Sequence, residues 1–205
     1  MKIGIRSMQA RITPAITASI LRTARGAIEA RLRHEEEAPP ELVAELVDAP
    51  EVSGVFVTVH VHGALRGCIG FLALQGSLAA TIAEAARRAA AHDTRFAPVT
   101  RDEREAMTVE VTLLAPLERI ADPDDFEIGV HGLVLEYLGR RGLLLPQVAV
   151  DQGWDRQQFL SGVCRKAMLP DRSWEHPDAT LSRFEGLVLR ETESHATPAP
   201  ERRTD

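Results

Sequence analysis

The sequence predicts an α+β protein in which an antiparallel sheet is flanked by helices. Alternating apolar residues form two candidate hairpins, at residues 54–71 and 133–145, and helical periodicity precedes, separates and follows them. The strands and helices do not alternate as regular βαβ units, which would indicate a parallel sheet. The second hairpin is the candidate centre of a smaller lobe at about residues 120–150.

Length and composition are those of a globular protein. The 205 residues fit one domain, or one domain with two lobes, which we place at residues 1–190. The chain is 44% hydrophobic, and no apolar run approaches the roughly 20 residues of a membrane span. Residues 1–9 contain no apolar signal core, and two distant cysteines make no disulfide framework. We therefore expect a cytoplasmic protein that does not enter a membrane.

The charge balance argues against a nucleic-acid partner. The formal net charge is -6, whereas nucleic-acid-binding domains usually carry a basic face. Only Lys2 and Lys166 of the 24 basic residues are lysines. We attribute this arginine bias to codon composition and give it no functional weight.

The first helix is expected after residue 13. Thr13 is a suitable N-cap, Pro14 suits the first helical position, and apolar residues recur on one face until about His34. Residues 35–40 are typical of a solvated linker, and a short helix is possible at residues 41–46. The central strand then begins at Gly54.

The first hairpin has two possible registers. Valines at alternate positions 55–61 share one face of its first strand, and His62-Gly63 is a plausible turn into the strand 65–71. A two-residue loop pairs Val57 with Cys68 and places the thiol on the valine face. A three-residue loop pairs Phe56 with Cys68 and places the thiol on the face of Thr58 and His60. A slip of one residue exchanges the faces, and both registers remain open.

The rest of the chain continues the mixed pattern of helices and strands. A helix capped by Ser77 is expected to reach about Ala91, followed by a short helix with the capping-box pair Thr100 and Glu103, and by a strand at 107–114. A turn at 122–125 then precedes a hairpin of strands 133–138 and 143–145, which a turn at 139–142 joins. The last expected elements are a helix capped by Asp151 or Asp155 and ending near Pro170, a strand at 181–189 and a disordered tail at 191–205.

The candidate functional residues centre on residues 65–70, which read LRGCIG. Glycine in a strand leaves no side chain to pack, so Gly67 and Gly70 indicate a bulge or the close approach of another group. Cys68 lies between them. One hypothesis is that Cys68 is a nucleophile or acyl carrier whose thiolate is favoured by cationic neighbours. The other is that Cys68 packs within the strand and the glycines admit a helix.

An activated thiol needs a base and a cation near it. His60, His92 and His131 are the candidate bases, and Arg66 and Arg95 are the candidate cations. The sequence does not place any of these side chains in contact with the thiol.

Charged residues near the motif also allow a binding site without catalysis. Arg66, Asp93 and Arg95 are candidates for the rim of a groove, in which an arginine grips a carboxylate or a phosphate, and Gln147 lines the same groove if the lobes close over it. Equally, Asp93 can pair with one of the arginines and hold its loop against the hairpin.

Metal and cofactor sites find little support. His60, His62 and Cys68 have a spacing that allows ligation from one strand face, but only in the favourable register, and we assign no metal. The glycine groups have neither dinucleotide-binding nor P-loop spacing, so we expect no nucleotide cofactor.

Several separated blocks resemble one known family. They are Val57-Thr58-Val59 with the motif at 65–70, Asp93-Thr94-Arg95-Phe96, His131-Gly132-Leu133, the segment 142–149, and Gly153-Trp154-Asp155. In these blocks, between about residues 13 and 189, the chain resembles the AmmeMemoRadiSam system protein A family, also called the Alport syndrome and elliptocytosis critical-region domain.

The resemblance implies a two-lobed α+β fold but no established reaction. It also implies two candidate partners, a Memo-like protein similar to extradiol dioxygenases and a radical S-adenosylmethionine enzyme. Our leading hypothesis is a binding or scaffold module that uses the glycine-rich hairpin and an arginine-lined groove. The alternative is a thiol-dependent enzyme or covalent carrier with Cys68 as the nucleophile on an anionic or carbonyl substrate.

Overall fold

The structure is a computed structural model that describes residues 5–35 and 52–191. The possible helix at 41–46 lies outside the described residues, as does the tail expected at 191–205 apart from Glu191, which accepts hydrogen bonds from Arg25. The elements are α1 (Ile5–Arg11), α2 (Pro14–Leu32), β1 (Gly54–Val61), β2 (Ala64–Phe71), α3 (Leu78–Ala91), the 3-10 helix η2 (Arg104–Ala106), β3 (Met107–Leu114), β4 (Glu118–Arg119), β5 (His131–Tyr137), β6 (Arg140–Leu144), α4 (Pro146–Asp151), α5 (Arg156–Lys166), the 3-10 helix η3 (Ser173–Glu175) and β7 (Thr180–Arg190).

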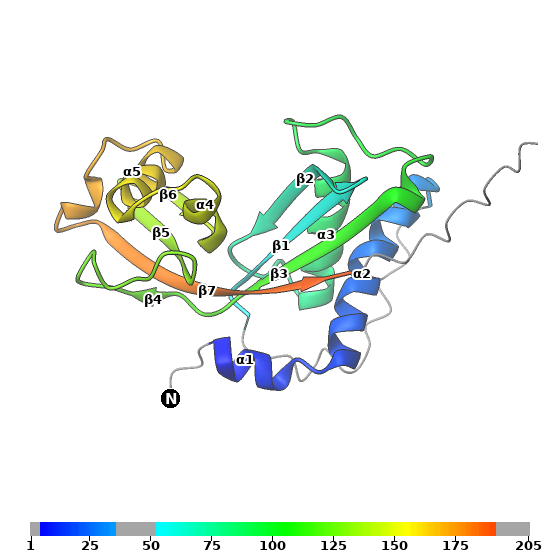
Figure 1. The fold of residues 1–205 in the computed structure, drawn as a ribbon, viewed down its shortest axis with the longest axis horizontal. Helices are drawn as coiled ribbons and strands as arrows, with labels where there is room; N and C mark the ends of the chain where they lie inside the picture. The colour runs from blue at the N-terminus through cyan, green and yellow to red at the C-terminus, as the bar shows by residue number, and fades with distance from the viewer. Residues whose placement is uncertain (1–4, 36–51, 192–205) are drawn as a thin grey trace, which may run out of the picture.

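The strands form one antiparallel sheet in the order β2-β1-β3-β7-β5-β6, and β4 pairs with β7. The long strand β7 serves both ends of the sheet, because residues 186–190 pair with β3 whereas residues 180–185 pair with β5 (Figure 1). The fold is therefore α+β with an antiparallel sheet flanked by helices, as the sequence predicts.

Three apolar clusters stabilise this sheet. The first lies between the valine face of β1 and helices α2 and α3. The second joins β5 to α4 and α5 and draws on residues from Ile120 to Leu181, which extends beyond the 120–150 segment expected for the smaller lobe. The third consists of Leu114, Val134 and Phe184, with Phe56 and Leu143 against it, and it connects strands from both ends of the sheet.

Local signals placed the helix starts well. The Thr13 Oγ1 accepts a hydrogen bond from Ile16 N, and Ser77 Oγ accepts one from Ala80 N. Of the two candidate caps for α5, Asp155 is the one used, in a capping box with Gln158.

The local structure differs from the sequence-based expectations in three places. The turn of the second hairpin is Leu138-Gly139, where both residues have positive φ, and not residues 139–142. Helix α4, which begins at Pro146, was not expected. Helix α1 was not expected.

The register of the first hairpin differs from both predicted alternatives. Val61 pairs with Ala64 across a two-residue turn, but His60 pairs with Leu65 and Val59 with Gly67, so that Arg66 is an extra residue in β2. This bulge shifts the rest of the strand by one residue. Cys68 therefore lies opposite Thr58, and the thiol is on the face away from α2 and α3.

Candidate functional site

The two glycines of the motif allow close packing. A Cβ built on Gly67 would lie 1.9 Å from the backbone oxygen of Ala89, so this glycine admits helix α3. A Cβ built on Gly70 would lie 2.3 Å from the ring of Phe56, on the other face of the strand. Both glycines are thus explained by neighbours within the protein.

Asp93 and Arg95 hold the backbone of Cys68 at the edge of the sheet. Cys68 N donates to Asp93 Oδ2 over 2.9 Å, and Arg95 Nη2 donates to the Cys68 carbonyl over 3.4 Å. Arg95 also donates to Asp93 through Nε, over 2.9 Å, and through Nη2, over 2.6 Å. Because β2 is an edge strand, this pair occupies backbone groups that another strand would otherwise use.

Arg66 joins the same loop to the hairpin. Its Nη1 donates to Ala97 O over 2.7 Å, and its Nη2 donates to both carboxylate oxygens of Glu103, over 2.8 and 3.0 Å. The Glu103 carboxylate also accepts from Thr100 N over 2.8 Å. The hydrogen bond from Thr100 N, followed by those from Arg66, lowers the pKa of Glu103 below its usual range. The Arg66 guanidinium is therefore occupied within the protein.

The Cys68 thiol lies in a polar row across four strands. Thr58 Oγ1 donates to Cys68 Sγ over 3.3 Å, Thr58 pairs with Glu110 on β3, and Glu110 pairs with Arg190 on β7. Burial raises the pKa of the Cys68 thiol, and the hydrogen bond from Thr58 and the charge of Arg95 offset that rise only in part. This environment favours the neutral thiol.

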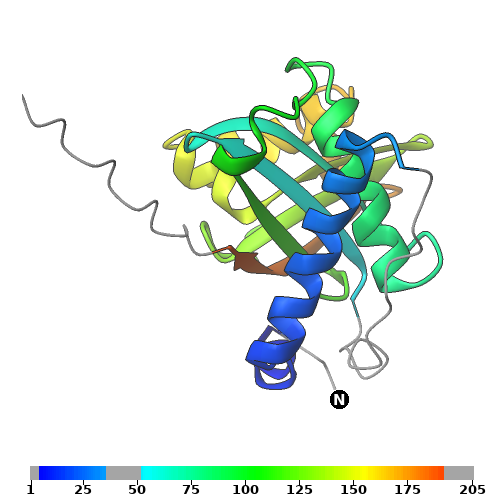
Figure 2. The same cartoon turned by 90° about the vertical axis from the view of Figure 1, so that its right-hand side faces the viewer.

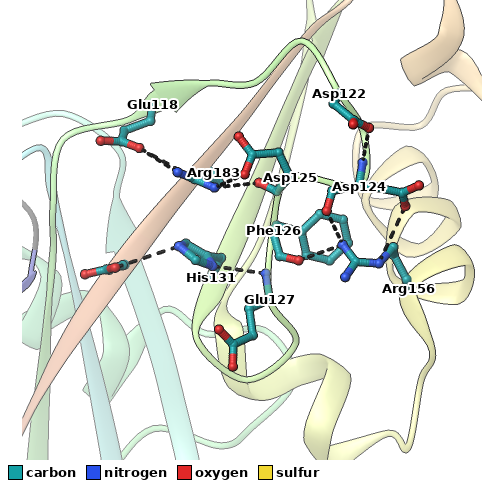
Figure 3. A network of polar contacts seen from close by, with 10 residues as sticks. Glu118, Asp122, Asp124, Asp125, Phe126, Glu127, His131, Arg156 and Arg183 are labelled. Carbon is teal, nitrogen blue, oxygen red and sulfur yellow. Dashed lines mark hydrogen bonds and ion pairs between the residues drawn. The ribbon is translucent and has the colours of Figure 1, made fainter.

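None of the three candidate bases forms a hydrogen bond with Cys68 among the described residues. His60 lies on β1 opposite Leu65, and His92 follows the last turn of α3. His131 belongs to β5, where its Nδ1 accepts from Glu127 N over 3.0 Å and its Nε2 lies 3.7 Å from Glu185 Oε1 (Figure 3). Gln147 lies on α4, whose Ala149 belongs to the second apolar cluster, whereas the valines of β1 belong to the first.

The polar network around His131 anchors the loop between β4 and β5. Arg183 on β7 binds Glu118 and Asp125, and Arg156 on α5 donates to the carbonyls of Asp124 and Phe126 (Figure 3). The Arg156 guanidinium also lies 4.5 Å from the centroid of the Phe126 ring. These contacts bind the loop to the sheet and to α5, and we assign them a structural role.

Sequence reasoning missed two residues next to the motif. The sequence placed Glu103 only in a capping box and Glu110 only within the strand at 107–114. The capping spacing found the Thr100 contact of Glu103, but its pairing with Arg66 spans 37 residues and leaves no local signal. Glu110 is notable because its side chain is only 12% exposed and pairs with Arg190.

The described residues contain no group of three or more His, Cys, Asp or Glu side chains that could hold a metal ion. None of the described helices is long and apolar enough to cross a membrane.

The raised pKa of Cys68 makes a prediction about its reactivity. In a Cys164→Ala background, alkylation of Cys68 by iodoacetamide is expected to follow an apparent pKa above the free value of about 8.5, because burial penalises the thiolate. The measurement is the alkylation rate between pH 6 and about 10, by mass spectrometry. Urea-unfolded protein is the control and should titrate near the free value. A native titration well below 8.5 would contradict this result and favour covalent chemistry.

Comparison with known proteins relates the chain to one family. The AMMECR1 family model matches residues 21–189. The chain is 41% identical over 185 residues to Protein TK0174 of Thermococcus kodakarensis, covering 84% of this chain and 88% of that protein. It is 42% identical over 185 residues to Protein PF1979 of Pyrococcus furiosus, covering 84% and 86%.

A solved structure has the same fold. The crystal structure of uncharacterised protein PH0010 from Pyrococcus horikoshii superposes with a TM-score of 0.73 at 38% identity, covering 84% of this chain and 89% of that one. The family match covers most of the chain, including the motif, the loop that follows α3 and the whole of the sheet. The chain therefore belongs to the AMMECR1 family, in agreement with the resemblance of its sequence motifs to the AmmeMemoRadiSam system protein A family.

Proposed function

We propose that this protein is a non-catalytic binding module of the cytoplasm that presents the β1–β2 hairpin and the loop 93–103 as one rigid surface to a protein partner. In this proposal Arg95 binds an acidic group on that partner. The observation that carries the proposal is the contrast within one ion pair, because the Arg95 side chain is 59% exposed whereas the Asp93 side chain that holds it is 5% exposed.

The geometry pre-organises Arg95. Its Nε and Nη2 are bound to Asp93, and its guanidinium lies 5.3 Å from the centroid of the Phe96 ring. A long side chain usually loses rotamer freedom when it binds, and this one has already lost it. Its Nη1 makes no hydrogen bond with the described residues and is available to a carboxylate or phosphate.

The rest of the surface supports binding better than catalysis. Both glycines are used for packing, Arg66 is used for anchoring, and the thiol is kept neutral. The family resemblance supplies the candidate partners, a Memo-like protein and a radical S-adenosylmethionine enzyme. The thiol-dependent alternative would need Cys68 to be ionised, which its burial opposes.

The test is the affinity for a purified Memo-like protein and, separately, for a purified radical S-adenosylmethionine enzyme, by isothermal titration calorimetry. We expect Arg95→Ala to weaken binding by about tenfold or more, as is usual for a central interface arginine. Arg95→Lys should recover only part of the loss, because the planar fork is absent.

Two controls make the result specific. Arg119→Ala removes an exposed arginine from β4 and should change the affinity by less than about twofold. Cys68→Ser should likewise change the affinity by less than about twofold. Loss of binding in Cys68→Ser with full binding in Arg95→Ala would overturn the proposal and favour the thiol-dependent alternative, and absence of binding to both proteins would remove the proposed partners.

A further inference from the structure

A second candidate site lies at the C-terminal ends of α2 and α3, which pack side by side (Figure 2). Two adjoining hollows share Arg31, and we call them together the α2–α3 groove. The larger, of about 500 Å³, is lined by Arg31, Glu84, Arg87, Arg88 and His92. The smaller, of about 370 Å³, is lined by Arg31, Leu32, His34, Val99, Thr100 and Arg101.

The charge of the groove is opposite to that of the protein. The described residues that line it include four guanidinium groups, two imidazoles and one carboxylate, although the chain has a formal net charge of -6. That carboxylate, Glu84, accepts hydrogen bonds from both Arg87, over 3.0 Å, and Arg88, over 2.6 Å. Arg31 forms no ion pair within the part of the chain that the structure describes. Among the described residues that line the groove, arginines therefore outnumber carboxylates.

Helix termini account for part of this charge. The C-terminal end of a helix carries a partial negative charge that favours cations, and Arg101 Nε donates to the carbonyl of Leu32 at the end of α2. Arg88 also lies over the Phe71 ring, 5.5 Å from its centroid. These contacts explain the positions of Arg101 and Arg88. They do not explain why four arginines surround a hollow large enough for a ligand.

We propose that the α2–α3 groove binds a small anion that carries two or more phosphate groups. Guanidinium groups match phosphate oxygens with paired hydrogen bonds, and the larger hollow has the size of ordinary ligand pockets. Because the two hollows meet at Arg31, linked phosphates can contact Arg31 together with an arginine of each hollow. The groove shares the loop 93–103 with the hairpin surface but uses its Thr100 and Arg101, whereas the hairpin surface binds its partner through Arg95.

Isothermal titration calorimetry with inorganic pyrophosphate tests the proposal. We expect one site on the intact protein, with affinity that weakens as salt is added. Arg31→Gln combined with Arg88→Gln should weaken pyrophosphate binding by about tenfold or more. Arg22→Gln is the matched control, because Arg22 is an exposed arginine on the same helix, and it should stay within about twofold. A thermal melt of each variant checks that it is folded.

Further probes define the ligand class. Tripolyphosphate should bind at least as tightly as pyrophosphate, whereas orthophosphate and citrate should bind more weakly. Equal weakening by the Arg22 and the groove variants, or no pyrophosphate binding to the wild type, would overturn the proposal. Tighter binding of a short single-stranded DNA, lost in the same groove variants, would replace the small anion with nucleic acid. Arg95→Ala should leave pyrophosphate binding intact, so failure here is distinguishable from failure of the hairpin surface.

Discussion

Gly67→Ala is expected to lower the free energy of unfolding by about 3 kcal/mol, at the upper end of the usual cost of overpacking. The added methyl would lie 1.9 Å from the oxygen and 2.9 Å from the carbonyl carbon of Ala89, and these are backbone atoms of α3 that no rotamer change can move. Helix α3 would have to leave the sheet, which disturbs the buried side chains of Ala85, Ala86 and Ala89. The measurement is urea denaturation followed by circular dichroism.

Gly26→Ala is the matched control for this prediction. Gly26 lies inside α2, and a Cβ built there meets no atom within 4 Å. Alanine is the better helix former, so this variant should gain about 0.5–1 kcal/mol. Similar stability of the two variants would show that α3 does not pack on β2 as closely as described.

Asp93→Asn is expected to cost about 2 kcal/mol near pH 7, the usual value for hydrogen bonds to a charged group. The amide keeps an acceptor for Cys68 N, but its NH₂ group faces the guanidinium donors of Arg95, and the ion pair is lost. The matched control is Asp102→Asn, an exposed aspartate in the same loop, which should change stability by less than about 0.5 kcal/mol.

The cost of Asp93→Asn is also expected to depend on pH. The hydrogen bonds from Arg95, followed by that from the Cys68 N–H, hold the pKa of Asp93 well below its usual range. A carboxyl with a depressed folded-state pKa contributes stability above its unfolded-state pKa, about 3.9, and loses it as the pH falls towards the folded value. The difference between wild type and variant should be constant from pH 8 to about 5 and shrink below about pH 4. A difference that grows on acidification would contradict this account, and urea midpoints at several pH values measure it.

The candidate site shows where sequence reasoning reaches its limit. The strand 65–71, the position of the turn at His62-Gly63 and the close approach permitted by the motif glycines all follow from residue types at neighbouring positions. The face of the thiol does not, because it depends on one extra residue at Arg66. That bulge goes with the anchoring of the Arg66 side chain by Glu103 and Ala97, which are more than 30 residues away in the chain.

By itself the sequence determined the α+β class, the helix caps at Thr13 and Ser77, and most strands, because these depend on local periodicity and on side chains within one turn of a backbone N–H. Only the tertiary structure decided that Arg66 is occupied, that Asp93 serves the Cys68 backbone and that β7 joins both ends of the sheet. Such pairings depend on which distant segments the closed chain brings together, and burial then sets the charge state of the groups that meet.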